Sequence, residues 1–205
     1  MTGVQTCALP IFPQVIELDI NPVLANSEGV IALDARIKIT SQIPVCKDDR
    51  LAIRPYPQEL EQSIERMGKS ILLRPIRPDD GEMHQRFFKA LDPTDVHSRM
   101  FVQMRELQPA LLARMTHIDY DREMAFIAVS KDTDGKDETL GVVRAIADPD
   151  NENAEFAIVV RSDLKGKGLG YGLMVKLLDY FQRRGTRRIV GEALPNNHAL
   201  LHLAR

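Results

Sequence analysis

The sequence predicts an α/β fold in which a mixed, largely antiparallel sheet is flanked by helices. Three segments rich in apolar and β-branched residues, 124–130, 139–148 and 154–161, are separated by turn-rich stretches, and this spacing predicts an antiparallel meander. A segment with apolar residues at helical spacing follows the third strand, and a glycine-rich stretch joins the two. Because strands and helices alternate there, we expect a layered α/β domain.

The first third of the chain predicts a hairpin and a linker. Segments 14–20 and 29–37 have strand-like composition with turn residues between them, so they predict a β-hairpin that needs a larger module for support. The polar, proline-bearing stretch 41–68 predicts a linker. Residues 1–11 follow neither pattern, and we interpret them as an unassigned, non-native start. The predicted units are therefore 12–40, the linker, and 69–205.

The main domain is expected to begin with a strand and two helices. A strand over 70–74 precedes a helix whose start carries Asp79 and Asp80, since carboxylates suit the positive end of a helix dipole. Pro109 and the apolar residues after it predict a second helix.

The segment after the meander predicts a longer helix, a strand and a final helix. The apolar face of the longer helix consists of Leu173, Met174, Leu177, Leu178 and Phe181. This helix is expected to end at Gly185. A strand over 187–192 then leads through Pro195 to a helix that begins near Asn197.

The composition excludes several classes of function. With 44% apolar and 27% charged residues the chain is expected to be soluble and globular, and its formal net charge of −2 provides no overall field for nucleic acid or membranes. Cys7 and Cys46 lack metal-ligand spacing and favour a reducing, cytoplasmic location. His198 and His202 are four residues apart, but no glutamate follows His198 as in zinc proteases, so no metal is expected.

The stretch 161–172 carries the strongest functional signal. Its glycines allow the backbone to turn tightly and to approach a ligand closely, and it lies between a strand and a helix. The free NH groups and the dipole in the first turn of a helix favour an anion such as a diphosphate. Lys165 and Lys167 add positive charge at the same place. The stretch therefore predicts an anion-binding loop.

Two common phosphate-binding patterns do not fit this loop. The dinucleotide fingerprint requires glycine where Tyr171 or Leu173 stands, and the P-loop requires an earlier glycine where Ser63 stands. The pattern basic-x-x-Gly-x-Gly does fit, beginning at Lys165. It resembles motif A of the GNAT acetyltransferase superfamily, which usually opens with glutamine or arginine; lysine leaves the role of the backbone intact.

The resemblance implies a GNAT-type sheet that binds acetyl-CoA and transfers its acetyl group to an amine. The diphosphate would be held by the loop and the helix start, at Lys165, Gly166, Lys167, Gly168, Leu169, Gly170, Tyr171 and Gly172. The strand at Ile158, Val159 and Val160 would hold the pantetheine arm along an edge left open where the sheet splays. Asn197 matches an asparagine before the family's last helix, and both cofactor contact and helix capping stay open as its role.

Glu155 is the candidate general base. An amine must lose a proton before it attacks a thioester, and a nearby carboxylate is able to accept that proton. On an extended strand Glu155 shares a face with Ala157 and Val159, whose small apolar side chains favour proton acceptance by a lone carboxylate. The alternative is that Glu155 only pairs with a basic residue at the end of the strand. The general acid stays unassigned.

Two stretches narrow the resemblance. Residues 154–166 resemble protein lysine acetyltransferases fused to acyl-CoA synthetase-like modules. Residues 12–39 resemble the C-terminal edge of the ATP-grasp domain in NDP-forming acyl-CoA synthetases. That family holds the magnesium of its nucleotide at the positions of Asn21 and Asp34, which are expected to be vestigial here. The expected acceptor is a protein lysine, with an acyl-CoA synthetase as a candidate protein partner.

A different class of function stays open beside the enzyme. It is a catalytically silent acyl-CoA-binding module that regulates a fused synthetase. The family's sheet ordinarily receives further strands after the helix near Asn197, so we expect the acetyltransferase domain to be incomplete and this chain to be weakly active or inactive.

Overall fold

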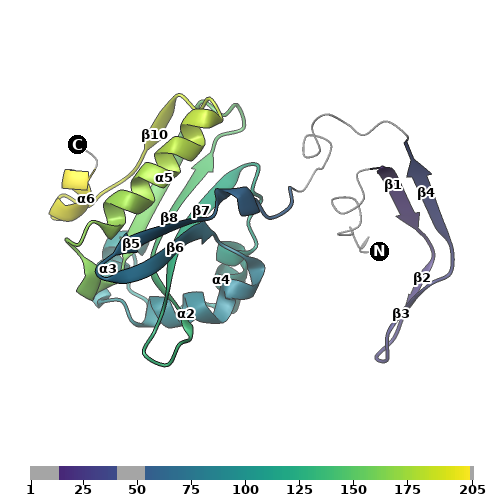
Figure 1. Ribbon diagram of the computed structural model, residues 1–205, viewed down its shortest axis with the longest axis horizontal. Helices are drawn as coiled ribbons and strands as arrows, with labels where there is room; N and C mark the ends of the chain where they lie inside the picture. The colour runs from purple at the N-terminus through teal and green to yellow at the C-terminus, as the bar shows by residue number, and fades with distance from the viewer. Residues whose placement is uncertain (1–13, 41–53, 204–205) are drawn as a thin grey trace. The chain divides into compact units, whose positions relative to one another are not determined.

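The computed structural model describes residues 14–40 and 54–203, which belong to two compact units (Figure 1). The first unit covers residues 1–55 and the second residues 56–205. None of the helices in the described ranges combines the length and apolar character of a membrane span.

The first unit contains the predicted β-hairpin. Its strands are β1 (Val15–Ile20), β2 (Val23–Ala25), β3 (Val30–Ala32) and β4 (Ala35–Ile39). β1 pairs antiparallel with β4, and β2 pairs antiparallel with β3. At the tip, Asn26 Oδ1 accepts hydrogen bonds from the NH groups of Glu28 and Gly29, each at 2.9 Å. Asn21 N donates to Asp34 O at 3.1 Å where the β1–β4 and β2–β3 pairs meet. The predicted strand 29–37 is divided into β3 and β4, whereas the predicted strand 14–20 corresponds to β1 alone.

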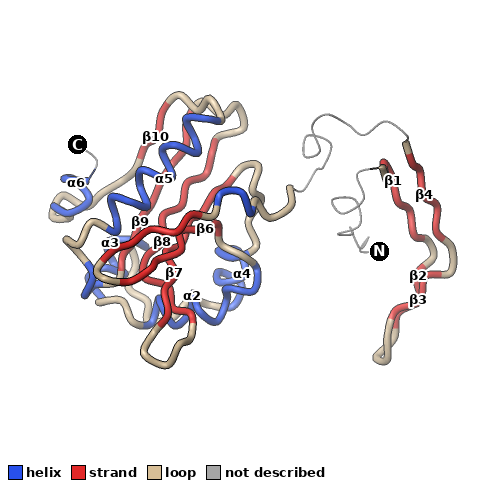
Figure 2. Tube along the Cα trace, viewed as in Figure 1, coloured by secondary structure: helices blue, strands red, loops and turns tan. Residues whose placement is uncertain are grey.

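The second unit is built on a six-stranded sheet with the order β10-β9-β8-β7-β6-β5 (Figure 2). Its strands are β5 (Gln62–Arg66), β6 (Lys69–Pro75), β7 (Glu123–Lys131), β8 (Asp137–Ala147), β9 (Asn153–Val160) and β10 (Arg188–Val190). Neighbouring strands are antiparallel except β9 and β10, which are parallel. The predicted meander and the mixed, largely antiparallel sheet are both confirmed.

β5 corrects the predicted extent of the linker. The prediction of a linker over 41–68 is wrong for residues 56–68, because η1 (Gln58–Leu60) and β5 belong to the second unit. β5 and β6 are joined by a turn at Met67 and Gly68, which have φ of 55° and 69°. Methionine is uncommon in this conformation, so the sequence lacks the usual signal of a tight hairpin. Residues 41–53, like the predicted unassigned start 1–11, lie outside the described residues.

Helices cover both faces of the sheet. They are α2 (Gly81–Lys89), α3 (Pro93–Met100), α4 (Pro109–Thr116), α5 (Leu169–Arg183) and α6 (His198–Leu203), with the short 3-10 turns η2 (Pro78–Asp80) and η3 (Ser162–Leu164). α5 packs on the face of Val160, because a Cβ added at Gly170 would lie 3.6 Å from the Val160 side chain. Arg144, the strand partner of Ala157, lies on the opposite face and donates to Met115 O of α4.

Part of the core lies between α5 and the central strands, and α2 contributes Phe87 and Phe88 to the core. Leu173, Leu177 and Phe181 are each at most 2% exposed, which confirms the predicted buried face of this helix. Leu178 is an exception, because it is 43% exposed and therefore belongs to the outer face. Gly185 has a φ of 78° just after the helix, as its predicted C-terminal signal requires.

Asp80 lies at the predicted start of a helix and also forms a buried ion pair. Its buried carboxylate accepts two hydrogen bonds from Arg74, at 2.8 and 2.6 Å, and a third from Arg77 N at 2.7 Å. This bidentate pair connects β6 to the start of α2.

Candidate functional site

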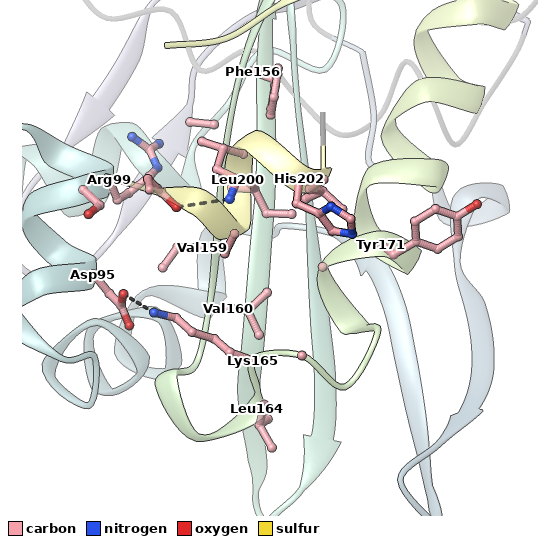
Figure 3. A pocket seen from close by; sticks show the side chains of 18 of the residues that line it. Asp95, Arg99, Phe156, Val159, Val160, Leu164, Lys165, Tyr171, Leu200 and His202 are labelled. Atoms are coloured by element: carbon pink, nitrogen blue, oxygen red, sulfur yellow. Dashed lines mark hydrogen bonds and ion pairs between the residues drawn. The ribbon is translucent and has the colours of Figure 1, made fainter. Parts of the chain in front are cut away.

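A cavity of about 820 Å³ lies beside β9 (Figure 3). Its walls come from β9, α3, the loop before α5, the first turn of α5, and α6. The predicted site residues that line it are Glu155, Ile158, Val159, Val160, Lys165, Gly166, Gly168, Gly170, Tyr171 and Asn197. Lys167, Leu169 and Gly172 do not line it, and the side chain of Leu169 is in the core at 1% exposure. The fold thus brings together most residues that were proposed from separate parts of the sequence.

One edge of β9 is open along this cavity. β10 pairs in parallel only with residues 153–155, whereas β8 occupies the opposite edge up to Val160. Beyond residue 155, β9 and β10 diverge. The ring of Phe156 packs at this divergence, because a Cβ added at Gly191 would lie 2.5 Å from it. Among the described strands, none pairs with residues 156–160 on this side, as expected from the predicted splay.

Two glycines shape the loop between β9 and α5. Gly166 and Gly168 have φ of 72° and 78°, a region that other residues avoid. A Cβ at Gly168 would lie 2.8 Å from Nη1 of Arg66, so any side chain there would displace this guanidinium. The Arg66 guanidinium therefore lies against the backbone of Gly168 and adds a positive charge beside the loop.

The N-terminus of α5 presents free amides. Gly168 is its N-cap residue, and no side chain in the described ranges caps this helix. The amides of Leu169, Gly170 and Tyr171 lie in the first turn and lack intrahelical acceptors. Gly172 N, by contrast, donates to Gly168 O at 3.1 Å, so the free amides end at Tyr171, one residue before the end of the predicted cradle. These amides and the helix dipole suit an anion.

The charge of Lys165 is compensated within the protein. Its ammonium forms an ion pair with Asp95 of α3, and Figure 3 shows the two side chains directed at each other. Ser162 Oγ donates to the same carboxylate at 2.6 Å, and Asp92 N donates to Ser162 Oγ at 3.0 Å. Lys165 therefore anchors the loop to α3 in this structure, whereas the sequence suggested a cation directed at a phosphate.

Sequence reasoning missed α3, although its start carries a signal. Asp92 precedes Pro93, and Asp92 Oδ1 accepts a hydrogen bond from Thr94 N at 2.9 Å, so aspartate is the N-cap and proline the first helical residue. The helix brings Asp95 and Arg99 into the cavity.

Glu155 is exposed at the point where β10 leaves β9. It lies opposite Ile146 of β8 and Val190 of β10. Across residues 14–40 and 54–203, no basic side chain comes within ion-pair distance of its carboxylate. The alternative role, an ion pair at the strand end, thus finds no partner in that part of the chain.

Arg99 adds a cation to the same cavity. Burial, reinforced by the nearby Arg144, lowers the pKa of Arg99 to about 10, while Glu155 acts in the opposite direction. The guanidinium is still protonated at neutral pH. Its Nη1 donates to Met100 Sδ at 4.0 Å, and no carboxylate within the described ranges comes within ion-pair distance.

Asn197 caps α6. Leu200 N donates to Asn197 Oδ1 and Leu201 N donates to Asn197 O, both at 3.1 Å. Of the two roles left open, capping is therefore observed, and the residue also lines the cavity. His202 lines the cavity as well, and the described residues contain no cluster of three potential metal ligands.

Comparison with known proteins decides the family. The family model described as the acetyltransferase (GNAT) domain matches residues 70–205, more than half of the chain. The chain belongs to the GNAT acetyltransferase family. It is 33% identical over 136 residues to the acetyltransferase PA5475 of Pseudomonas aeruginosa, and the match covers 66% of this chain and 73% of that protein.

Solved structures agree with a GNAT fold. The GNAT domain of S. lividans PAT has a TM-score of 0.65 and 25% identity, over 73% of this chain and 88% of that one. Spermidine N-acetyltransferase from Vibrio cholerae, in complex with CoA and spermine, has a TM-score of 0.51 and 20% identity, over 65% of this chain and 77% of that one. The predicted fold class and the class of enzyme are confirmed.

The segment before the GNAT domain matches a second family model. The ATP-grasp domain model matches residues 7–39, of which 14–39 are described. The backbones of Asn21 and Asp34 are hydrogen bonded where the two strand pairs of the hairpin meet. The Asp34 carboxylate lies 4.0 Å from the Arg36 guanidinium. A vestigial magnesium site at these positions stays a prediction.

Proposed function

We propose that this GNAT domain transfers an acetyl group from acetyl-CoA to the amine of a protein lysine. The observation that carries the proposal is the meeting of three features at one cavity. They are the open edge of β9, the uncapped N-terminus of α5 and the exposed carboxylate of Glu155.

The residues present fit the two polar parts of acetyl-CoA. Its diphosphate matches the free amides of residues 169–171 and the glycine loop before them, where the cationic Arg66 guanidinium lies against Gly168. Its pantetheine arm carries amide groups, which match the unpaired backbone groups of residues 156–160 in the way that an added strand would. The thioester would then lie toward the Glu155 end of β9.

Glu155 is the proposed general base. A lysine amine has an ordinary pKa of about 10.4, so it arrives protonated and must lose a proton before it reacts. The carboxylate would accept this proton directly or through a water molecule. The amine nitrogen then forms a bond to the thioester carbon and the carbon–sulfur bond breaks. The acetylated nitrogen releases its second proton, and the departing CoA thiolate takes up a proton to become the thiol. Holding both reactants in one cavity lowers the entropic cost of this direct attack.

A protein lysine is proposed as the acceptor because of the chain's neighbouring segment. Residues 154–166 resemble lysine acetyltransferases fused to synthetase modules, and the ATP-grasp match at 7–39 supports such a fusion. An acyl-CoA synthetase is accordingly the proposed protein partner.

Acetyl-CoA titration combined with turnover assays tests the proposal. We expect Glu155→Gln to bind acetyl-CoA as the wild type does and to lose at least about a hundredfold in kcat, the usual contribution of a general base. Glu65→Gln is the matched control, because Glu65 lies on β5 outside the cavity and is exposed. Undiminished kcat in Glu155→Gln would show that the base is another group. A wild-type chain that binds acetyl-CoA without turning over any amine would instead support the silent regulatory module or the incomplete domain expected from the sequence.

A further inference from the structure

We propose that Arg99 selects acceptors that carry a carboxylate close to the reacting amine. This inference rests on the proposed acetyl transfer and deepens it, because it assigns a chemical class to the acceptor.

Arg99 lies toward the reacting end of the cavity, away from the phosphate loop. Asp95 and Arg99 are four residues apart on α3, so they lie on one face of the helix about one turn apart. Asp95 reaches the loop through its ion pair with Lys165, and Arg99 is one turn further along. In Figure 3, Lys165 and Asp95 lie toward the loop and Arg99 lies toward Phe156.

Arg99 forms no ion pair with a carboxylate in the described part of the chain, although Glu155 lies close enough to act on its charge. Asp95 is already engaged by Lys165 and Ser162. Glu155 and Glu192 line the same cavity, but neither forms an ion pair with Arg99. A partly buried cation without a counter-charge is costly, and a ligand carboxylate would offset that cost through charge-assisted, bidentate hydrogen bonds.

The counter-charge is assigned to the acceptor because acetyl-CoA does not supply one at this end. Its phosphates fit the amides at the start of α5, and its pantetheine arm is uncharged. An aspartate or glutamate beside the target lysine would bring a carboxylate next to the amine, and so would the α-carboxylate of a free amino acid. Both sources present the same chemistry to Arg99.

Steady-state kinetics with matched acceptors tests the inference in the full 205-residue chain. Two lysine peptides that differ only in a neighbouring glutamate or glutamine are compared, with free lysine as a third acceptor. We expect the wild type to favour the glutamate peptide by about tenfold in kcat/KM, as one charge-assisted contact allows. Arg99→Gln should abolish this preference through a higher KM for the glutamate peptide, with unchanged affinity for acetyl-CoA. Arg99→Lys should retain part of it.

Arg86→Gln is the matched control. Arg86 is an exposed cation on α2 whose ion pair with Glu82 is 3.9 Å long, and it does not line the cavity. We expect this variant to keep the peptide preference of the wild type. If Arg99→Gln does not fold in a thermal melt, Arg99→Met removes the same charge and provides the same comparison.

The outcomes separate this inference from the proposed function. Equal use of both peptides by the wild type overturns the role of Arg99 while acetyl transfer stands. An equal loss on both peptides in Arg99→Gln also overturns it, because Arg99 would then act on the thioester. Preferential use of free lysine supports the inference and assigns the carboxylate to a small molecule. A wild type that acetylates no amine overturns both proposals.

Discussion

Lys165 and Asp95 form an ion pair that joins the loop before α5 to helix α3. The glycine-rich motif is therefore held from outside, by a residue seventy positions earlier in the chain. Ser162 strengthens the connection through its hydrogen bond to the same carboxylate. The position of the proposed diphosphate cradle thus depends on α3 as well as on local glycine conformation.

The ion pair should contribute modestly to stability. In a double-mutant cycle with Asp95→Asn and Lys165→Met we expect a coupling free energy of about 0.5–1 kcal/mol, because the Lys165 side chain is 48% exposed and solvent screens the attraction. Urea unfolding of the wild type, both single variants and the double variant measures it. Strictly additive effects would show that the pair contributes nothing.

Gly168→Ala should weaken both acetyl-CoA binding and the fold, whereas Gly185→Ala should weaken the fold alone. Both Gly168 and Gly185 have a φ of 78°, but only Gly168 has a neighbour, Arg66, within 4 Å of an added Cβ. Each alanine variant should lose about 1–2 kcal/mol of unfolding free energy from the left-handed conformation alone.

Calorimetric titration distinguishes the two glycines. We expect Gly168→Ala to raise the Kd for acetyl-CoA by about tenfold or more, since one lost charge-assisted contact has that size. Gly185→Ala should leave the Kd unchanged. A normal Kd in Gly168→Ala would argue against a cradle at this loop.

Asp80→Ala should destabilise the GNAT domain severely. It leaves the Arg74 guanidinium buried without its carboxylate, and breaking a buried pair in this way costs about 3–5 kcal/mol. Chemical denaturation measures the loss. Glu82→Ala is the comparison, because the Glu82 carboxylate is 95% exposed and its pair with Arg86 should contribute less than about 0.5 kcal/mol.

Stability should fall as the pH falls through the range set by His84. Burial, reinforced by the nearby Arg144, lowers the pKa of His84 from 6.5 to about 4. The unfolded chain therefore binds a proton below about pH 6.5, whereas the folded chain does so only near pH 4. The contribution of neutral His84 is complete above pH 6.5 and decreases as the pH drops toward 4, by about 3 kcal/mol in total.

The comparison with His84→Gln isolates this effect from the carboxylates. Between pH 7 and pH 4 the unfolding free energy of the wild type should fall by more than that of the variant, because glutamine does not titrate. Parallel pH profiles for the two proteins would contradict the assignment.

Long periodic segments were predictable from the sequence, because a segment that buries one face has apolar residues at regular spacing. The buried stripe of α5 and the three apolar strands β7, β8 and β9 are such segments. The loop was predictable because glycine at positive φ and basic residues are local features. Glu155 and the open edge of β9 followed from strand alternation and the family resemblance.

The missed elements are short or depend on tertiary contacts. β5 carries a single partly buried apolar residue, Ile64, so its sequence shows no alternating pattern. α3 has eight residues and one buried side chain, Val96. The ion pair of Lys165 with Asp95 and the entry of Arg99 into the cavity join distant parts of the chain, and a one-dimensional pattern carries no trace of such contacts.

The hairpin of β5 and β6 affects the choice of the first residue for a recombinant GNAT domain. The family model begins at residue 70, within β6, so a recombinant domain started there would lack the strand that covers this edge. Ile71 and Leu73, now almost fully buried, would border a row of unsatisfied backbone groups that invites pairing between molecules. A start at Tyr56, where the compact unit begins, keeps the largely polar strand β5 at that edge and is the more soluble choice.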